Sequence, residues 1–202
     1  MKRRKFIAVS GTGVMATLAG CIPDAERVQE LPRPTTGVED SGVTVQAFED
    51  FSCPACAAYE ENVFSLIKEQ YVDNGDISYE HYDYAIPVHP RWSFEVANAA
   101  RSVQDSLGDE EFFEYKKLMF DNQDIYNRDL LVREAENVGI EDTDTFRSNL
   151  SSSLYRPVIE SDTDTGEDMG VQGTPAVFVN GELVSKPDFE TISMAIDEEL
   201  DS

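Results

Sequence analysis

A pair of closely spaced cysteines, placed between a strand and a helix, constrains the fold of this 202-residue chain more than any other feature. Residues 43–48 are rich in β-branched side chains and follow a glycine, a pattern that predicts a strand. Apolar side chains then recur at helical spacing through residues 57–71, so Cys53 and Cys56 are expected where a helix begins. Pro54 suits this place, because the N–H groups of a first helical turn have no partner within the helix.

The expected position of the pair predicts its chemistry. Unpaired N–H groups and the helix dipole stabilise a thiolate over a thiol, so Cys53 is the expected nucleophile. Cys56 lies one turn deeper, where it can attack a mixed disulfide on Cys53 and release the partner. Glu49 and Asp50 precede the pair and oppose thiolate formation through like charge. The pair therefore predicts thiol–disulfide exchange.

Two other uses of the pair stay open from the residues alone. A zinc site needs four ligands, and it could recruit only Cys53, Cys56, His81 and His89, without a second closely spaced pair. A purely structural disulfide is the other use, although so short a loop removes little entropy from the unfolded chain. We expect both histidines to be structural, since neither is beside the cysteines in sequence.

A second motif lies far downstream. Gly173, Thr174 and Pro175 precede a predicted strand at residues 176–179, and Asn180–Gly181 is a two-residue turn before a returning strand at 182–184. A proline at the mouth of a strand cannot donate to the ladder, and X-Pro is the bond at which cis peptides occur. The alternative is a trans proline that opens an edge strand.

These two motifs together resemble the thioredoxin superfamily, and within it the DsbA-like branch. The resemblance covers roughly residues 43–200 and implies an α/β thioredoxin fold with an inserted α-helical subdomain at about residues 90–166. In that family the Thr-Pro bond is cis and packs against the cysteines. The resemblance therefore implies that Thr174 and Pro175 border the substrate site, with Cys53 and Cys56 as the catalytic pair.

The chain departs from the branch in two places. The dipeptide between the cysteines is Pro54-Ala55, without the histidine that many strong oxidases of the branch place before the second cysteine. Ala47 stands on the strand where many relatives carry a buried acid that helps to deprotonate that cysteine. Proton transfer then relies on water, or on Glu49 if its side chain turns inward.

The segment between the two motifs reads as several consecutive helices, which is independent support for a helical subdomain. Apolar residues recur at helical spacing in three stretches, and Gly139 is a predicted helix stop. Trp92, Tyr115 and Phe120 could face a substrate, but aromatic residues at helical spacing are more often core residues.

The first twenty residues predict an export signal. Arg3-Arg4 before an apolar run resembles a twin-arginine signal, and residues 18–21 resemble the lipobox of exported lipoproteins. The resemblance implies that Cys21 becomes a lipidated N-terminus. Residues 21–42 are proline-rich and predict a tether, with the folded domain at 43–202. The alternative is a basic leader beside an incidental cysteine.

The chain is strongly acidic, with 40 Asp and Glu against 16 Lys and Arg and a formal charge of −24. Such a surface repels phosphates, so nucleic acid is not an expected partner. Molar salt shortens the Debye length to about 3 Å and so screens the repulsion between the acidic side chains, which lets the folded chain carry so high a charge. We therefore predict a salt-adapted source, in particular a halophilic archaeon; an acidic protein from ordinary salinity is the alternative.

We predict a disulfide oxidase held by lipid on the outer face of the cell membrane, because proteins outside the cytoplasm meet an oxidising compartment. Its expected partners are unfolded or reduced exported proteins and a membrane redox partner that recharges the pair. No metal or other bound cofactor is expected. An extracytoplasmic reductase or isomerase is the alternative within the same chemistry, and a non-catalytic lipoprotein that holds peptides or copper is the alternative from another class.

Overall fold

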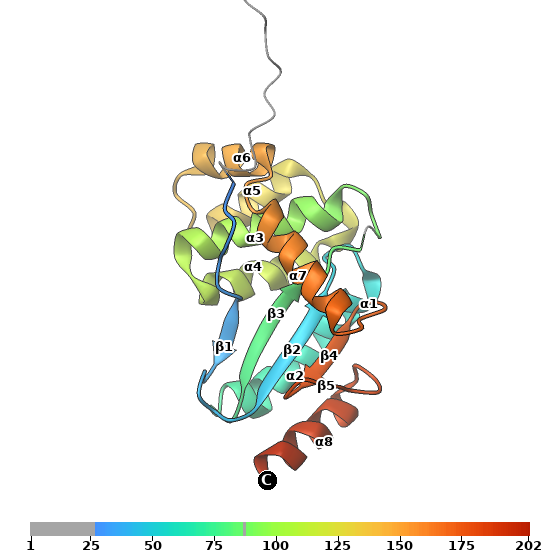
Figure 1. Cartoon of the computed structure of the whole chain (residues 1–202). Helices are drawn as coiled ribbons and strands as arrows, with labels where there is room; N and C mark the ends of the chain where they lie inside the picture. The colour runs from blue at the N-terminus through green and yellow to red at the C-terminus, as the bar shows by residue number, and fades with distance from the viewer. Residues whose placement is uncertain (1–26, 87) are drawn as a thin grey trace, which may run out of the picture.

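The structure, a computed structural model, describes residues 27–86 and 88–202 (Figure 1). In this part of the chain one sheet has the strand order β1-β3-β2-β4-β5. β2 is parallel to β3 and antiparallel to β4, and the outer strands β1 and β5 pair antiparallel with their neighbours. The strands are β1 Thr35–Gly37, β2 Thr44–Glu49, β3 Ser78–Asp83, β4 Ala176–Val179 and β5 Glu182–Leu183.

The strand before the cysteine pair and the hairpin after Pro175 follow the sequence prediction closely. β2 runs one residue further than expected, so that Glu49 pairs in register with Asp83 of β3. The β4–β5 hairpin turns at Asn180 and Gly181, whose φ angles of 46° and 83° suit a tight two-residue turn. Asn180 also accepts a hydrogen bond from the Thr44 N–H at 2.8 Å, which ties this turn to the start of β2.

One helical run follows Cys53 without a break. It comprises α1 Pro54–Tyr59, the π-helical turn η2 Glu60–Phe64, α2 Ser65–Ile67 and the π-helical turn η3 Lys68–Val72. The predicted helix is therefore confirmed, with π-helical turns that the apolar spacing did not indicate. The C-terminal helix α8, Phe189–Leu200, contacts β4 and α2.

The inserted helices lie between β3 and β4 in the sequence and mostly beyond one end of the sheet in space, and the last of them, Arg156–Asp168, extends back along the sheet to contact β3 (Figure 1). A single chain segment supplies them all, as the resemblance implied. α5 ends just before Gly139, whose φ of 115° is the conformation that a glycine adopts easily after a helix. The helices are α3 Trp92–Leu107, α4 Asp109–Asp121, α5 Arg128–Asn137, α6 Thr143–Ser152 and α7 Arg156–Asp168, with a 3-10 turn η4 at Gln123–Ile125.

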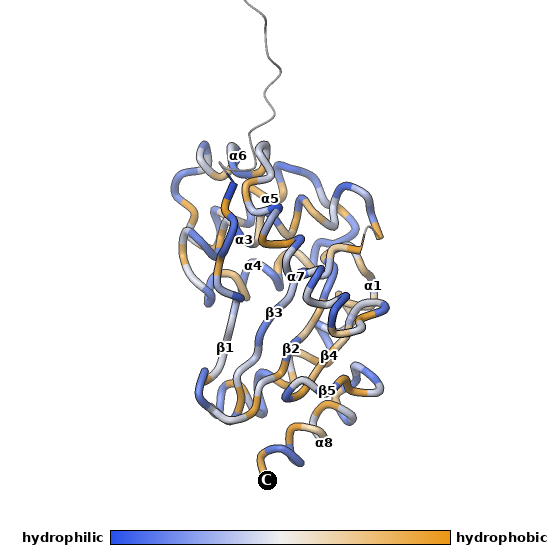
Figure 2. Tube along the Cα trace, in the orientation of Figure 1, coloured by the Kyte–Doolittle hydropathy of each residue, from blue (hydrophilic) through white to orange (hydrophobic). Residues whose placement is uncertain are grey.

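Hydrophobic side chains cover both faces of the sheet. β4 is hydrophobic along its whole length (Figure 2). The larger cluster joins β2 and β3 to α1, α2, α4 and α8, and the smaller one lies on the other face around Phe48, Tyr84 and Phe178. Gly166 of α7 packs on that smaller cluster, where a Cβ would lie 2.6 Å from the Tyr84 ring. This close approach explains a glycine inside a helix.

The predicted tether is wrong over much of its length. Thr35–Gly37 form β1 and pair with β3, and the Pro34 carbonyl accepts a hydrogen bond from the His81 N–H at 3.0 Å. Val28 donates to the Leu154 carbonyl at 3.0 Å, so the chain is attached to the helical subdomain from that residue on. Backbone pairing of this kind needs no apolar periodicity, which is why the pattern did not show it.

The predicted signal and lipidated cysteine, residues 1–20 and Cys21, lie outside the described residues. Among the helices that are described, none has the length and apolar character needed to cross a membrane.

Candidate active site

Cys53 is the N-cap residue of α1, immediately before its first helical residue. Its backbone is extended, with φ −83° and ψ 118°, while Pro54 is the first helical residue. The Cys53 carbonyl accepts hydrogen bonds from the N–H groups of Cys56 at 3.0 Å and Ala57 at 3.2 Å. The Cys53 N–H in turn donates to the Asp50 carbonyl at 2.9 Å, so a tight turn presents the thiol at the start of the helix.

The two cysteines are free thiols in different surroundings. Cys53 is 8% exposed, whereas Cys56 is fully buried behind it. A hydrogen bond from the Cys56 thiol, together with one involving Thr174 and with backbone N–H groups, lowers the pKa of Cys53 to about 5. Burial raises the pKa of Cys56 well above its ordinary value, and the nearby Glu49 charge adds to this. At neutral pH one thiolate and one thiol therefore face each other.

The downstream motif lies against the nucleophile. The Thr174–Pro175 peptide bond is cis, as the resemblance implied. Cys53 Sγ is 3.5 Å from the Thr174 carbonyl oxygen, although the two residues are 121 positions apart. The loop thus places open backbone beside the sulfur, at a position where an extended peptide could lie.

Asp50 lies on the same side as Cys53. Its Oδ1 accepts a hydrogen bond from the Ser52 N–H at 2.7 Å, and the Ser93 side chain also interacts with the carboxyl group. Burial raises the pKa of Asp50 to about 6, and the negative charges of Cys53 and Asp83 contribute to the increase. The carboxyl group and the thiolate next to it therefore titrate in neighbouring pH ranges.

Glu49 turns inward, to the side of Cys56. Its Oε1 lies 2.7 Å from Lys116 Nζ and 3.4 Å from His81 Nδ1, and all three side chains are fully buried. Burial acts to raise the pKa of Glu49, but the charge of Lys116 and the contacts with His81 outweigh it and the pKa is lowered. Lys116 Nζ also contacts Glu60 Oε2 at 2.7 Å, so one ammonium bridges two buried carboxylates.

Further charges continue this arrangement on the other side of His81. His81 Nε2 lies 3.2 Å from Asp83, Asp83 contacts Arg101 at 2.6 Å, and Arg101 also pairs with Asp162. Burial acts to lower the pKa of His81, but hydrogen bonds with Asp83 and Glu49 raise it and favour the imidazolium. We call the resulting series of alternating charges the ionic network: Arg33, Asp162, Arg101, Asp83, His81, Glu49, Lys116 and Glu60.

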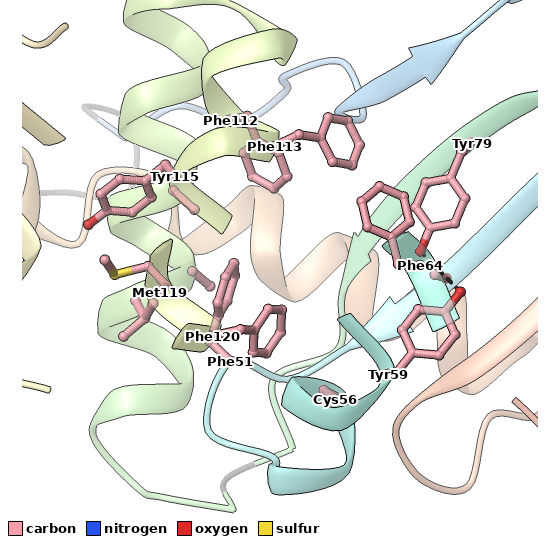
Figure 3. Close-up of a cluster of buried hydrophobic side chains, with 14 of the residues drawn as sticks. Phe51, Cys56, Tyr59, Phe64, Tyr79, Phe112, Phe113, Tyr115, Met119 and Phe120 are labelled. Atoms are coloured by element: carbon pink, nitrogen blue, oxygen red, sulfur yellow. Dashed lines mark hydrogen bonds between the residues drawn. The ribbon is translucent and has the colours of Figure 1, made fainter. Parts of the chain in front are cut away.

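Aromatic rings enclose the centre of this network. Figure 3 shows Phe64 and Tyr79 side by side, Phe113 beside Phe112, and Phe120 nearer the turn that carries Cys56. Lys116 Nζ lies 4.5 Å from the centre of the Phe64 ring and between 5.7 and 5.8 Å from those of Tyr79, Phe113 and Phe120. Rings that face a cation stabilise it when water is excluded.

The inserted helices supply contacts to the active-site turn that the sequence did not indicate. Gln123 Nε2 donates to the carbonyls of Phe51 at 2.8 Å and Cys53 at 3.0 Å. Tyr126 Oη lies 3.0 Å from the same Phe51 carbonyl. These polar residues occupy a turn between helices, where periodicity gives no signal. They fix the backbone on either side of Ser52.

The other residues singled out from the sequence make contacts within the helical subdomain. His89 is exposed, and its Nδ1 accepts hydrogen bonds from the N–H groups of Arg91 and Trp92 at the start of α3. Tyr115 and Phe120 are core residues, and Trp92 is half-buried against Tyr126. Within residues 27–86 and 88–202, no three His, Cys, Asp or Glu side chains are grouped as a metal site requires.

Comparisons with known proteins agree with this geometry. A family model described as thioredoxin matches residues 30–198. The probable disulfide bond formation protein D of Bacillus cereus is 32% identical over 169 residues, which cover 81% of this chain and 77% of the relative. Its counterpart from Bacillus anthracis is 33% identical over 172 residues, covering 81% and 76%.

A solved structure shows the same fold. BdbD from Bacillus subtilis, in its oxidised form, superposes with a TM-score of 0.77 at 24% identity, covering 88% of this chain and 100% of that one. The chain therefore belongs to the thioredoxin family and is a DsbA-like protein-disulfide oxidoreductase.

Proposed function

We propose that Cys53 and Cys56 exchange disulfides with exported proteins, with Cys53 as the sulfur that meets the client. The observation that carries this assignment is the contrast between the two thiols. Cys53 begins a helix, is partly exposed and has a pKa of about 5, whereas Cys56 is buried with a raised pKa. A thiolate at ambient pH is the reactive form of a cysteine, so the outer sulfur reacts first.

The mechanism follows from this arrangement. In the oxidised protein, a client thiolate attacks Cys53 Sγ and forms a mixed disulfide, while the bond to Cys56 breaks. A second client thiolate then attacks the client sulfur of that bond and leaves Cys53 as a thiolate. The Thr174 backbone, 3.5 Å from Cys53 Sγ, is where the client chain pairs in an extended conformation. Pro175, which cannot donate a backbone hydrogen bond, keeps the next position open.

Oxidation of clients is the direction that we propose. A lowered pKa stabilises the reduced pair through the Cys53 thiolate, and a stabilised reduced form makes the disulfide a stronger oxidant. Equilibration with glutathione buffers in molar salt tests this by giving the reduction potential. A potential above that of the glutathione pool supports the oxidase, whereas one well below it supports a reductase.

The catalytic assignment has a direct test in Cys56→Ser. This variant lacks the thiol that can attack a Cys53 mixed disulfide from within the protein, so clients that bond to Cys53 under oxidising conditions should accumulate and appear as reducible adducts on non-reducing gels. Cys53→Ser is the matched control and should trap nothing. If Cys56→Ser forms no adducts with reduced, unfolded protein under oxidising conditions, the two cysteines do not exchange disulfides with clients.

We further propose that the chain acts outside the cytoplasm, held by lipid on Cys21, with a membrane protein that reoxidises the pair. Arg3-Arg4 and the small residues before Cys21 support this. Cys21→Ser should still be exported but should leave the membrane fraction. Unchanged membrane retention would instead assign the anchor to the uncleaved leader.

The charge of −24 supports a source that lives at high salt, as a halophilic archaeon does. Carboxylates on such a surface repel one another at low ionic strength, and added salt screens that repulsion. The free energy of unfolding should therefore rise between about 0.1 M and about 1 M salt. A flat or falling dependence would assign the acidic surface to solubility at ordinary salinity.

A further inference from the structure

The turn that carries Cys53 is held from two sides. Within the turn, the Asp50 carbonyl accepts a hydrogen bond from the Cys53 N–H at 2.9 Å, and Asp50 Oδ1 accepts one from the Ser52 N–H at 2.7 Å. From outside, Gln123 of the inserted helical subdomain donates to the carbonyls of Phe51 and Cys53. The proposed nucleophile is therefore tied to a residue 70 positions further along the chain.

The Gln123 amide suits both acceptors at once. Both partners are carbonyl oxygens, so the NH₂ group and not the amide oxygen faces the turn. Its nitrogen lies 2.8 Å from the Phe51 oxygen and 3.0 Å from the Cys53 oxygen, so each of its N–H bonds has one acceptor. A hydroxyl group in the same place has a single hydrogen to donate. The Gln123 side chain therefore spans Ser52 and orients the carbonyl groups on both sides of it.

Pro54 makes the Cys53 carbonyl depend on such contacts. The peptide plane between Cys53 and Pro54 is rigid and has no N–H, so hydrogen bonds can hold it only at its carbonyl. Among the described residues, the donors to this carbonyl are the N–H groups of Cys56 and Ala57 in α1 and the Gln123 side chain. Of these donors, Gln123 is the one that comes from outside the helix.

The inserted subdomain also packs against the turn at Phe51. This side chain is 1% exposed, and its ring stacks on Phe120 of α4 with 5.1 Å between the ring centres. Tyr126 Oη adds a hydrogen bond to the Phe51 carbonyl at 3.0 Å. The turn therefore cannot move relative to the helical subdomain without losing apolar and polar contacts together.

The place of Cys53 Sγ depends on the orientation of this backbone. Hydrogen bonds from the Cys56 thiol and from backbone N–H groups at the start of α1 stabilise its thiolate, and the Thr174 carbonyl oxygen lies 3.5 Å away. Rotation of the peptide plane after Cys53 changes its ψ angle, which is 118°, and turns the sulfur relative to the helix. The titratable groups that act on Cys53 are Cys56 from α1 and Asp50 from the turn.

We propose that Gln123 is a positioning residue for disulfide exchange, which holds the Phe51 and Cys53 carbonyls so that the reactive sulfur stays at the start of α1. The inserted helical subdomain thereby sets the reactivity of the nucleophile. In the contacts that the structure describes, Gln123 bonds to the backbone of the turn and to neither sulfur, so it acts through that backbone. The inference rests on the proposed role of Cys53.

Gln123→Met tests this role, because methionine is close to glutamine in length and volume but has no donor. The reduced protein is alkylated with iodoacetamide across the pH range, and mass spectrometry assigns the label to Cys53 or Cys56. Without the two hydrogen bonds the thiolate loses part of its stabilisation, so the pKa of Cys53 in the labelling profile should rise by about 0.5–1 from about 5. The labelling rate at pH 5 should fall by about two- to fivefold, whereas the rates at pH 8 should agree within about twofold, since Cys53 is ionised there in both proteins.

The reduction potential is the second readout. In glutathione buffers, the reduced protein and one glutathione disulfide exchange with the oxidised protein and two glutathione molecules. A less stable Cys53 thiolate makes the reduced protein less stable, so the Gln123→Met disulfide should be a weaker oxidant. At neutral pH we expect the equilibrium constant to change by about threefold to tenfold, which lowers the potential by about 15–30 mV.

Asn127→Ala is the matched control, because Asn127 lies in the same connection between α4 and α5. Its side chain caps α5 by accepting a hydrogen bond from the Leu130 N–H at 2.9 Å, and its other described contact is with the Ile125 carbonyl. Its labelling profile and its potential should match the wild type even if its stability falls. Equal changes in Asn127→Ala and Gln123→Met would overturn the inference, because any disturbance of this connection would then have the same effect.

Tyr126→Phe provides a second test if Gln123→Met does not fold. It keeps the ring and loses the hydrogen bond to the Phe51 carbonyl, so both readouts should change in the direction expected for Gln123→Met. A wild-type profile and a wild-type potential in Gln123→Met, or in Tyr126→Phe where that variant replaces it, overturn the inference. A wild-type Cys53 that labels no faster than Cys56 at pH 5 would instead overturn the proposed function.

Discussion

Glu49 and Asp50 are neighbours in sequence and equally buried, each 1% exposed, yet they lie in two different regions of the active site. Glu49 faces the ionic network behind Cys56, where Lys116 and His81 overcome the effect of burial and lower its pKa. Asp50 faces the turn before Cys53, where no cation is among the causes of its shift and its pKa rises to about 6. Burial alone therefore does not set the ionisation of a carboxyl group; the partner that it meets does.

The difference arises because successive side chains near a strand end point in opposite directions. Glu49 is the last residue of β2 and points to the larger core, whereas Asp50 begins the turn and bonds back to Ser52. The same division separates the cysteines, with the thiolate on the side of Asp50 and the buried thiol on the side of Glu49. In the inner region Glu49 stays ionised at neutral pH, because its pKa is lowered. In the outer region Asp50 and Cys53 have pKa values of about 6 and about 5, so both groups change charge in mildly acidic solution.

Removing the cation from the inner region should have the largest effect on stability. Lys116→Met leaves two buried carboxylates without their shared partner, and we expect the free energy of unfolding to fall by roughly 3–5 kcal/mol. Urea denaturation measures the change. Lys117→Met is the control, because Lys117 is exposed and pairs only with Asp121 in the described contacts, so the loss should be under about 1 kcal/mol. Equal losses would mean that the buried charges are not what stabilises this region.

Removing the acid from the outer region should change reactivity more than stability. In the wild type the rate of Cys53 alkylation should be level at neutral pH and fall as pH drops through about 5, because the thiolate is lost there. Asp50→Asn removes a carboxyl group that is already mostly protonated below its pKa of about 6, so the fall near pH 5 should move only slightly to lower pH. The rate gain at pH 5 should be less than about tenfold, the equivalent of one pKa unit.

Iodoacetamide labelling across the pH range measures this profile. Glu49→Gln is the matched comparison, because the Glu49 charge acts on Cys56 rather than on the outer sulfur. Its labelling profile should stay close to that of the wild type. Equal shifts of the pH profile in the two variants would show that both carboxyl groups act on the pKa of Cys53 to the same extent.

The smallest effect is expected from the contact that holds the outer turn to the helical subdomain. Gln123→Ala removes two hydrogen bonds to the Phe51 and Cys53 carbonyls, and a hydrogen bond of this type contributes about 1 kcal/mol. Amide exchange should increase at residues 51–53 and stay unchanged around Glu49. A global increase would instead assign Gln123 to the stability of the whole domain.

The sequence predicts the outer region better than the inner one. Cys53, Pro54 and the Asn180–Gly181 turn are local signals, since each depends on residues adjacent in the chain. The partners of Glu49 are not local: Lys116 comes from an inserted helix and His81 from the next strand. A lysine on an amphipathic helix normally reads as solvent-exposed, so nothing near Lys116 in sequence indicates that it is fully buried.

The attachment of the N-terminal segment to the helical subdomain also limits how far the folded domain can lie from a lipid on Cys21. Because Val28 is bonded to Leu154, at the turn between α6 and α7, the chain between a lipidated Cys21 and the body is only residues 22–27. Fully extended, a chain segment of that length spans about 20–25 Å. The proposed anchor would therefore keep the helical subdomain close to the bilayer and orient the enzyme, which limits its clients to chains that emerge near the membrane surface.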